Sequence, residues 1–304
     1  MKKLKLKNSL FAAFTVVALL FTDSQCLAQG DSTITRSFKQ TFQMEADGLF
    51  DVNLQYSQLK VVNWDSSAVS IEGMVEALTA DSAEAEEIFN LLTVDMYSSP
   101  LETGLSTRVD AEYKEREKQP FTITFTVKLP KSVGVLGRFD FCKVDVPTLS
   151  GPTDLKFNYT DLTADSLNFN KSEVAGKHST TEISNFAGNM IASQYGTLKV
   201  GTITDSTEVI NEYGTADINK LSNSCRWLKL VNDFGDIQIT VSDSISYKMD
   251  VDSSYGTLIF PEEDEDMPLT DPAKETEWQA TFGSAKEEAI LKIDNEFGSI
   301  TFTR

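Results

Sequence analysis

The sequence predicts an all-β protein whose short strands stack as the turns of a β-solenoid. Three observations support this fold: a short motif recurs along the 304 residues, its copies keep a nearly constant spacing, and apolar and polar residues alternate around it. A period of about 20 residues with one corner in each unit is typical of solenoids. An antiparallel β-sandwich is the alternative, because its turns also recur, at intervals of about 8–12 residues. A sandwich does not require the fixed period found here.

The repeated motif is an aromatic residue, a glycine or small residue, any residue, and then an aliphatic residue. Clear copies begin at Tyr195-Gly196, Tyr213-Gly214, Phe234-Gly235, Tyr255-Gly256 and Phe297-Gly298, and weaker ones at Tyr56, Phe141 and Tyr159. Neighbouring copies are 18 residues apart from Tyr195 to Tyr213 and 21 apart from Tyr213 to Phe234. The gaps of 36 after Tyr159 and 42 after Tyr255 are twice these values. They predict degenerate turns near Lys177 and around 268–277.

A polar residue recurs two positions before the aromatic residue. These positions hold Ser193, Asn211, Asn232, Ser253 and Asn295. Stacked turns place equivalent residues about 4.8 Å apart, so an internal polar ladder is predicted, bonded to the turns above and below. Phe234 has the parity of the core residues Leu228 and Leu230, which predicts aromatic stacking on the core side. Gly235 stands where the parity changes, and we expect it to turn the corner with a positive φ.

The chain before the regular repeat is predicted to cover one end of the solenoid. Residues 29–130 contain alternating strand segments, and a helix over about 80–92 begins with the capping-box pattern of residues 81–84. A solenoid needs such a cover for the apolar face of its first turn, and the helix is expected to pack there or beside the early strands. Residues 131–304 then form the regular turns, continuous with the preceding region as one domain. Residues 296–304 still resemble a repeat, so the last turn is expected to present an open edge.

The first 28 residues are predicted to be a secretory signal peptide. Lysines precede an apolar run over 10–21, which is too short to span a bilayer, and Ala28 suits the cleavage position. Lipidation of Cys26 is the alternative, but residues 23–25 lack the small or branched apolar side chains that it requires. No later apolar run reaches about 18 residues. The mature chain is therefore expected in the periplasm, on the cell surface or outside the cell, without a membrane span.

The charge balance argues against polyanionic partners. The chain has 27 Lys and Arg against 46 Asp and Glu, a net charge of −19. Removal of four lysines and one aspartate with the leader leaves 23 against 45, or −22. Such a surface repels nucleic acids and anionic lipid head groups, so no nucleic-acid partner is expected.

The sequence shows no pattern that predicts catalysis, a cofactor or a firm metal site. It lacks Gly-x-Ser-x-Gly and clusters of Cys and His at metal-ligand spacing. Its one histidine, His178, lies in a polar segment and is expected to be solvated. Carboxylates near the corners form a candidate acidic column for Ca²⁺ or acid–base chemistry, although a solvated edge is the simpler interpretation. They are Asp145, Asp161, Asp217 and Asp236.

Two further features bear on metal binding and cross-linking. A run of five acidic residues between prolines is a weak calcium candidate, and a hydrated loop is the simpler interpretation. It consists of Glu262, Glu263, Asp264, Glu265 and Asp266. Cys142 and Cys225 are 83 residues apart, about four turns or ~20 Å along a solenoid. A disulfide requires Cα atoms within about 7 Å, so no Cys142–Cys225 bond is expected.

The order of these features resembles the putative-adhesin β-solenoid family of exported bacterial proteins, a domain of unknown function. The resemblance covers about residues 40–304. It rests on Tyr56 to Leu59 followed by Trp64-Asp65, the acidic helix over 80–92, the strand over 121–131, Leu149-Ser150-Gly151 and the aromatic-Gly turns. It implies a single-stranded, right-handed β-helix in the cell envelope, with no catalytic residues to transfer. Ser57, Cys142 and Thr160 stand where the family favours glycine, and 261–277 is an insertion.

These observations predict a non-enzymatic, exported cell-envelope β-solenoid that acts as an adhesin or as a scaffold for an envelope protein or glycan. Two alternatives stay open: a β-helical carbohydrate-active enzyme, and an envelope-stress or sensing protein that binds another envelope protein. Glycan turnover would identify the first, and recovery of a specific envelope partner would identify the second.

Overall fold

The structure is a computed structural model. It describes residues 23–26 (backbone only), 33–45, 47–110, 121–261, 268, 273–283 and 285–304. The predicted cleavage point after Ala28 and the acidic run 262–266 lie outside these residues. The described chain is mostly β-structure with one short helix, and it divides into two compact units, 1–147 and 148–304. No helix within the described ranges is long and apolar enough to cross a membrane.

Two sheets make up the first unit. The strand order in one is β1 (Asp23–Cys26), β2 (Thr33–Gln43), β5 (Ala68–Ala77), β8 (Phe121–Leu129), β4 (Ser57–Asn63) and β10 (Lys143–Val146). The order in the other is β9 (Gly134–Asp140), β3 (Leu49–Gln55), β7 (Glu102–Val109) and β6 (Leu92–Ser98). The turn formed by β3 and β4 pairs in parallel with β9 and β10 on one side and with β7 and β8 on the other. Antiparallel pairing joins β1 to β2, β2 to β5, β5 to β8 and β6 to β7.

The helix α1 spans Ser82–Asn90, within the predicted 80–92. Asp81 caps it, because its side chain accepts hydrogen bonds from the backbone N–H groups of Ala83 and Glu84. Ile88 and Phe89 are buried on the helix face that packs against β5 and β6. Since β6 is an edge strand, the helix lies beside one edge of that sheet.

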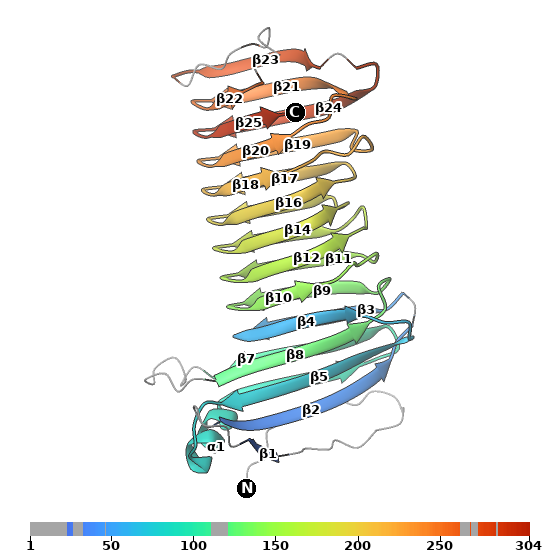
Figure 1. Cartoon of the computed structure of the whole chain (residues 1–304), viewed down its shortest axis with the longest axis vertical. Helices are drawn as coiled ribbons and strands as arrows, with labels where there is room; N and C mark the ends of the chain where they lie inside the picture. Colours follow the sequence, from blue (N-terminus) through green and yellow to red (C-terminus); the bar gives the residue numbers. More distant parts are fainter. Residues whose placement is uncertain are drawn as a thin grey trace. The chain divides into compact units, whose positions relative to one another are not determined.

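In the second unit the strands stack almost entirely in parallel (Figure 1). One sheet has the order β12 (Asp161–Leu167), β14 (Thr180–Phe186), β16 (Thr197–Ile203), β18 (Thr215–Ile218), β20 (Asp236–Thr240), β25 (Ser299–Thr303) and β22 (Thr257–Ile259). The other has β11 (Thr153–Asn158), β13 (Glu173–Lys177), β15 (Met190–Gln194), β17 (Thr207–Glu212), β19 (Trp227–Asp233), β24 (Glu288–Glu296), β21 (Ser246–Ser254) and β23 (Glu275–Phe282). This pairing is consistent with a β-solenoid and not with the antiparallel sandwich.

The core of the second unit follows from the period-two alternation of its strands. In β20, for example, Ile237 and Ile239 are buried while Asp236 and Gln238 are exposed. Equivalent residues lie opposite one another in neighbouring turns, so that Val209 pairs with Leu230 and Leu230 with Ile293. Each apolar column is therefore buried only by stacking of successive turns.

The C-terminal end differs from the predicted order. Strand β24 lies between β19 and β21, and β25 lies between β20 and β22 (Figure 1). Residues 296–304 therefore do not form an open edge, because the last stretch of chain is inserted between two earlier turns. Strand β23, which begins within the segment predicted as a degenerate turn around 268–277, is not a further parallel turn either, since it runs antiparallel to β21.

An aromatic cluster closes the interior at this end. Phe260 stacks on Phe302 with ring centroids 5.0 Å apart, and Phe282 meets Phe302 edge-on at 5.7 Å. Phe282 and Phe302 are fully buried. A return strand bearing large aromatic residues thus supplies the C-terminal cap that is not evident from the repeat pattern.

Candidate functional site: the aromatic corner

Each corner is turned by the aromatic residue itself. Non-glycine residues rarely adopt positive φ, yet φ is 54° at Tyr195, 53° at Tyr213 and 50° at Phe234. Gly283 is the one glycine with positive φ among the described residues. The predicted positive φ at Gly235 is therefore wrong, because the change of parity occurs one residue earlier.

Glycine follows the aromatic residue because neighbouring turns approach too closely for a side chain. A Cβ atom on Gly235 would lie 2.4 Å from Asn211 Nδ2 and 2.7 Å from the Gly214 carbonyl oxygen. A Cβ on Gly298 would lie 2.1 Å from the Gly235 carbonyl oxygen. The motif therefore requires glycine because neighbouring turns lie close together, and not because the backbone needs a positive φ at that position.

The polar residues two positions before the aromatic residue form a buried chain of hydrogen bonds. Asn211 Nδ2 donates to Asn232 Oδ1 at 2.9 Å, and Asn232 Nδ2 donates to Asn295 Oδ1 at 2.8 Å. Asn295 Nδ2 donates to Ser253 Oγ at 3.5 Å. The same amides also donate to the carbonyls of Gly214, Gly235 and Gly298. The ladder thus supplies hydrogen-bond donors to the backbone carbonyl groups of the corner, and it also links the turns.

Corners without this glycine carry their polar group on the other side of the aromatic residue. Ser179 Oγ donates to the Lys177 carbonyl oxygen at 2.6 Å and accepts from the Thr160 N–H at 3.0 Å. In the first unit Ser57 Oγ donates to the Gln55 carbonyl oxygen at 2.7 Å. The residue two before the aromatic one is then apolar or glycine: Leu54, Phe139, Phe157 and Gly176. The departures from glycine at Ser57 and Thr160 are therefore compensated locally.

The aromatic side chains form a stacked column on the surface. In the second unit its order is Tyr159, His178, Tyr195, Tyr213, Phe234, Phe297 and Tyr255, with centroids 4.7–5.1 Å apart and rings within 12° of parallel. In the first unit Tyr56 stacks on Phe141 at 4.9 Å. Seven of these residues, all except Tyr56 and His178, are 44–53% exposed; His178 is also exposed, and Tyr56 is half-buried. This differs from the predicted stack on the core side. At a corner residue with positive φ, the side chain does not follow the inward–outward alternation of the two flanking strands, and it points to solvent.

His178 is exposed at the bend between β13 and β14, as expected, but it also belongs to this column. Its ring lies 4.7 Å from Tyr159 and 5.0 Å from Tyr195, and its φ is 49°. It fills the degenerate turn predicted near Lys177, 19 residues after Tyr159 and 17 before Tyr195. The spacing was the available signal, and it was missed because histidine was not counted as an aromatic residue.

Substitution of His178 tests its structural role. Because its ring is stacked on both faces, we expect His178→Ala to lower the free energy of unfolding by about 1–2 kcal/mol. His178→Tyr restores the residue type of the neighbouring corners and should change stability by less than about 0.5 kcal/mol. Urea unfolding measures both. Equal stability of the two variants would contradict a stacking role.

Carboxylates flank the aromatic column in three successive turns. Glu212, Asp233 and Glu296 immediately precede Tyr213, Phe234 and Phe297, and strand register aligns Glu212 with Asp233 and Asp233 with Glu296. Burial, followed by the negative charge of Asp233 and neighbouring groups, raises the pKa of Tyr213. The recurrent Asn-acid-aromatic-Gly pattern contains this row, so the sequence held the signal for it.

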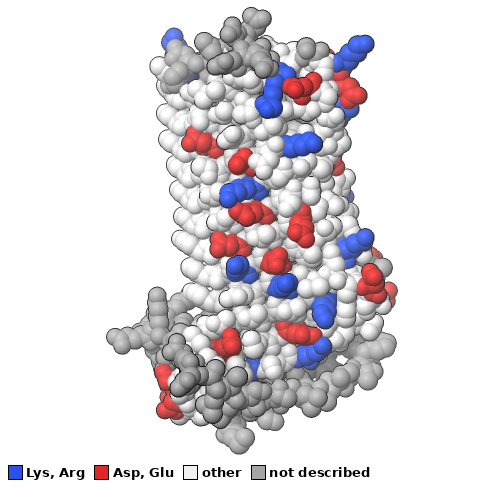
Figure 2. Space-filling view, viewed as in Figure 1, with Lys and Arg blue, Asp and Glu red and all other residues white. Residues whose placement is uncertain are grey.

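The predicted acidic column is not assembled. Asp161 and Asp236 occupy equivalent positions, but Thr180, Thr197 and Thr215 separate them. Asp217 pairs with Lys199 and Gln238, and Asp145 lies in the first unit. No group of three or more His, Cys, Asp or Glu suited to a metal ion occurs in the ranges that the structure describes. Figure 2 shows Lys and Arg interspersed with Asp and Glu on the face viewed.

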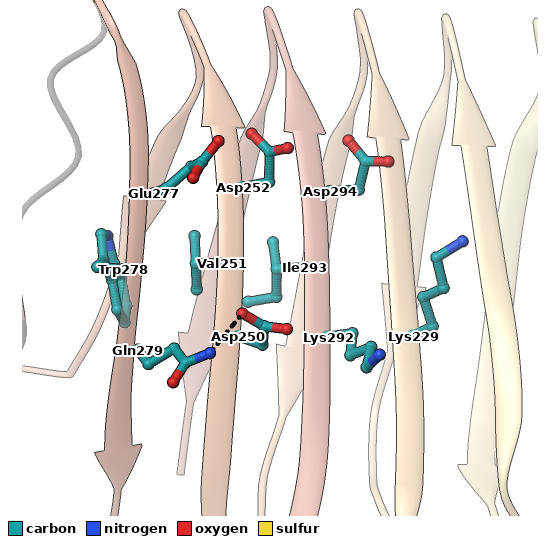
Figure 3. Close-up of a pocket in the computed structure, with 10 residues that line it drawn as sticks. All are labelled: Lys229, Asp250, Val251, Asp252, Glu277, Trp278, Gln279, Lys292, Ile293 and Asp294. Carbon is teal, nitrogen blue, oxygen red and sulfur yellow. Dashed lines mark hydrogen bonds between the residues drawn. The ribbon is translucent and has the colours of Figure 1, made fainter.

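A shallow hollow of about 570 Å³ lies on the outer face of β19, β24, β21 and β23 (Figure 3). Glu277, Asp252 and Asp294 form a row across three strands on one side. The other side has Gln279, Asp250, Lys292 and Lys229. Gln279 Nε2 donates to Asp250 Oδ1 at 3.2 Å, and Lys229 pairs with Glu208 at 2.7 Å. This is a mixed-charge surface, open to solvent.

Cys142 and Cys225 are both buried and free. Burial raises the pKa of each thiol to about 11. Such thiols are poorly reactive, because the thiolate is the nucleophile.

The raised pKa of Cys225 predicts alkaline destabilisation. The thiol stays protonated when folded but ionises above about pH 9 when unfolded, so its stabilising contribution is complete below pH 9 and lost by about pH 11. The full loss is roughly 3 kcal/mol. We expect Cys225→Ala to flatten the decline in unfolding free energy between pH 9 and 11, measured by urea titration. An unchanged slope would contradict this assignment.

The known proteins that match this chain were found among solved structures. No family model and no curated protein matches it. It is similar to a putative adhesin from Bacteroides fragilis, with 12% identity, a TM-score of 0.39, and coverage of 88% of this chain and 97% of that one. It is also similar to a putative cell adhesion protein from Clostridium sporogenes (8% identity, TM-score 0.27, 88% and 98% coverage). A putative lipid binding protein from Parabacteroides distasonis matches with 12% identity, a TM-score of 0.33, and 88% and 97% coverage.

Proposed function

We propose that the chain is an exported, non-enzymatic β-solenoid of the cell envelope that serves as an adhesin or interaction scaffold. The observation that carries this proposal is the half-exposed aromatic column, which the stack presents at a regular interval. A continuous row of exposed apolar side chains is typical of interaction sites. The signal-peptide pattern of residues 1–28 and the resemblance to the putative-adhesin family support export and this class of function.

The solenoid is proposed to be right-handed and single-stranded, with turns of 18–21 residues. Parallel crossover connections are right-handed in nearly all proteins, and the second unit is built from such connections. The family resemblance of the sequence favours the same hand.

Binding rather than catalysis is favoured by the position of the titratable groups. The chain has one histidine, and its ring faces are covered by Tyr159 and Tyr195. Both thiols in the described part of the chain are buried. The best alternative site is the hollow lined by Asp252, Asp294 and Glu277, since paired carboxylates are the groups that hydrolyse glycosides. A carbohydrate-active enzyme is therefore the second candidate.

The experiment measures adhesion and turnover together. Beads coated with the exported protein are applied to surfaces bearing polysaccharides or envelope proteins, and reducing ends released into solution are counted. We expect adhesion to at least one surface, its loss in the double variant Tyr195→Ser/Tyr213→Ser, and no release of reducing ends. Lys199→Ala, an exposed residue on β16, is the matched control.

Two outcomes would contradict the proposal. Polysaccharide turnover would replace it with the enzyme, and absence of adhesion to every surface would remove the scaffold. Protease digestion of intact cells tests location separately, since an exposed envelope protein should be cleaved without lysis.

A further inference from the structure

The corner ridge is the part of the second unit where apolar and acidic surfaces meet. We use this name for the rings of Tyr213, Phe234 and Phe297 together with the carboxylates that precede them, Glu212, Asp233 and Glu296. The rings are 44%, 47% and 46% exposed. The ridge therefore offers a ligand two adjacent strips, one apolar and one negatively charged.

The apolar strip consists of ring edges. Phe234 lies between Tyr213 at 5.0 Å and Phe297 at 4.7 Å, within 11° of parallel to both, so its two faces are covered. Sugar stacking and cation–π contacts both need an open ring face. The exposed edges instead suit aliphatic chains that lie along the column.

The acidic strip lacks cationic partners among the residues that the structure describes. No Lys or Arg in the described ranges forms an ion pair with Glu212, Asp233 or Glu296. Glu212 accepts only a hydrogen bond from Gln194, at 2.6 Å. Three aligned carboxylates of like charge, none of which has a cationic partner among the described residues, favour an external donor of positive charge.

The acidic strip extends over three strands, so a single compact ion cannot contact all three carboxylates. Adjacent strands are about 4.8 Å apart, which places Glu212 and Glu296 two steps, or about 10 Å, from each other. Lysine and arginine side chains combine aliphatic stems with terminal charges. An extended basic peptide laid along the stack would place stems on the ring edges and charges at the carboxylates.

We propose that the corner ridge binds an extended, lysine- or arginine-rich peptide segment of a partner protein. This inference rests on the proposed scaffold function and names the chemistry of its partner. The net charge of −19 would assist the encounter at low ionic strength.

Fluorescence anisotropy with the exported protein and labelled octalysine tests the proposal. The ridge variant Glu212→Gln/Asp233→Asn/Glu296→Gln removes three charges without changing side-chain shape. The control variant Asp252→Asn/Glu277→Gln/Asp294→Asn removes three aligned charges from the hollow, where there is no ring strip. We expect at least tenfold weaker binding by the ridge variant and less than threefold by the control.

A second measurement uses the unmodified protein. Octamers of diaminopropionic acid carry amines on a stem of one carbon, so they cannot cover the ring edges; at a pH at which the amines of both peptides are protonated, we expect them to bind at least fivefold more weakly than octalysine. Equal binding of the two peptides, equal losses in the two variants, or no octalysine binding would each overturn the proposal. Ridge-dependent binding of spermine without octalysine binding would also overturn it. Adhesion of coated beads that persists in the ridge variant would leave the scaffold function standing while removing this partner.

Discussion

Deletion of residues 285–304 is expected to abolish cooperative folding at the C-terminal end of the second unit. These residues form β24 and β25, which separate β19 from β21 and β20 from β22. Their loss removes backbone pairing on both sides and the four largest buried apolar side chains of the segment: Leu291, Ile293, Ile300 and Phe302. At about 1.5–3 kcal/mol for each side chain, roughly 6–12 kcal/mol is lost. This is comparable with the whole stability of a typical domain.

Hydrogen exchange of β21 measures this effect. The amides of Ser246–Ser254 should lose most of their protection in the deleted chain, because their parallel neighbour is absent. The control is Lys292→Ala, because Lys292 is an exposed residue of β24. It should alter the free energy of unfolding by less than about 0.5 kcal/mol. Retained protection of those β21 amides that do not bond to β23 would mean that β21 pairs directly with β19, as simple sequential stacking predicts.

Gly235→Ala is expected to destabilise the protein by at least about 3 kcal/mol, near the upper end of overpacking effects. The added methyl group would lie 2.4 Å from Asn211 Nδ2 and 2.7 Å from the Gly214 carbonyl oxygen. To remove this steric clash, the protein would have to separate two stacked turns or break the hydrogen bond from Asn211 to Asn232. Both asparagine side chains are buried. Urea unfolding, followed by far-UV circular dichroism, measures the loss.

Thr160→Ala is the matched control for this substitution. Thr160 occupies the same place after its aromatic residue but already accommodates a Cβ atom, and its hydroxyl donates to the Asn158 carbonyl oxygen at 2.9 Å. Its replacement should cost about 1 kcal/mol, the usual value for one hydrogen bond. If Gly235→Ala were no more costly than Thr160→Ala, close approach would not be the reason for glycine in the motif.

Sequence patterns predicted those features that depend on neighbouring residues in the chain. The capped helix at Ser82–Asn90 and the alternation within strands such as β20 follow from local spacing and were correctly placed. The candidate site was predicted only in part. The motif located the corner residues, but it assigned their rings to the core and left His178 outside the column.

The sequence by itself determined the period of the repeat and which residue of each turn meets its equivalent in the next. It did not determine which turns are neighbours, because the corner residues Asn232, Ser253 and Asn295 occupy interchangeable positions. The tertiary structure decided that order by placing β24 between β19 and β21 and by ending the array with the antiparallel strand β23. It also decided that the aromatic rings face solvent, since a corner with positive φ interrupts the alternation by which sequence predicts burial.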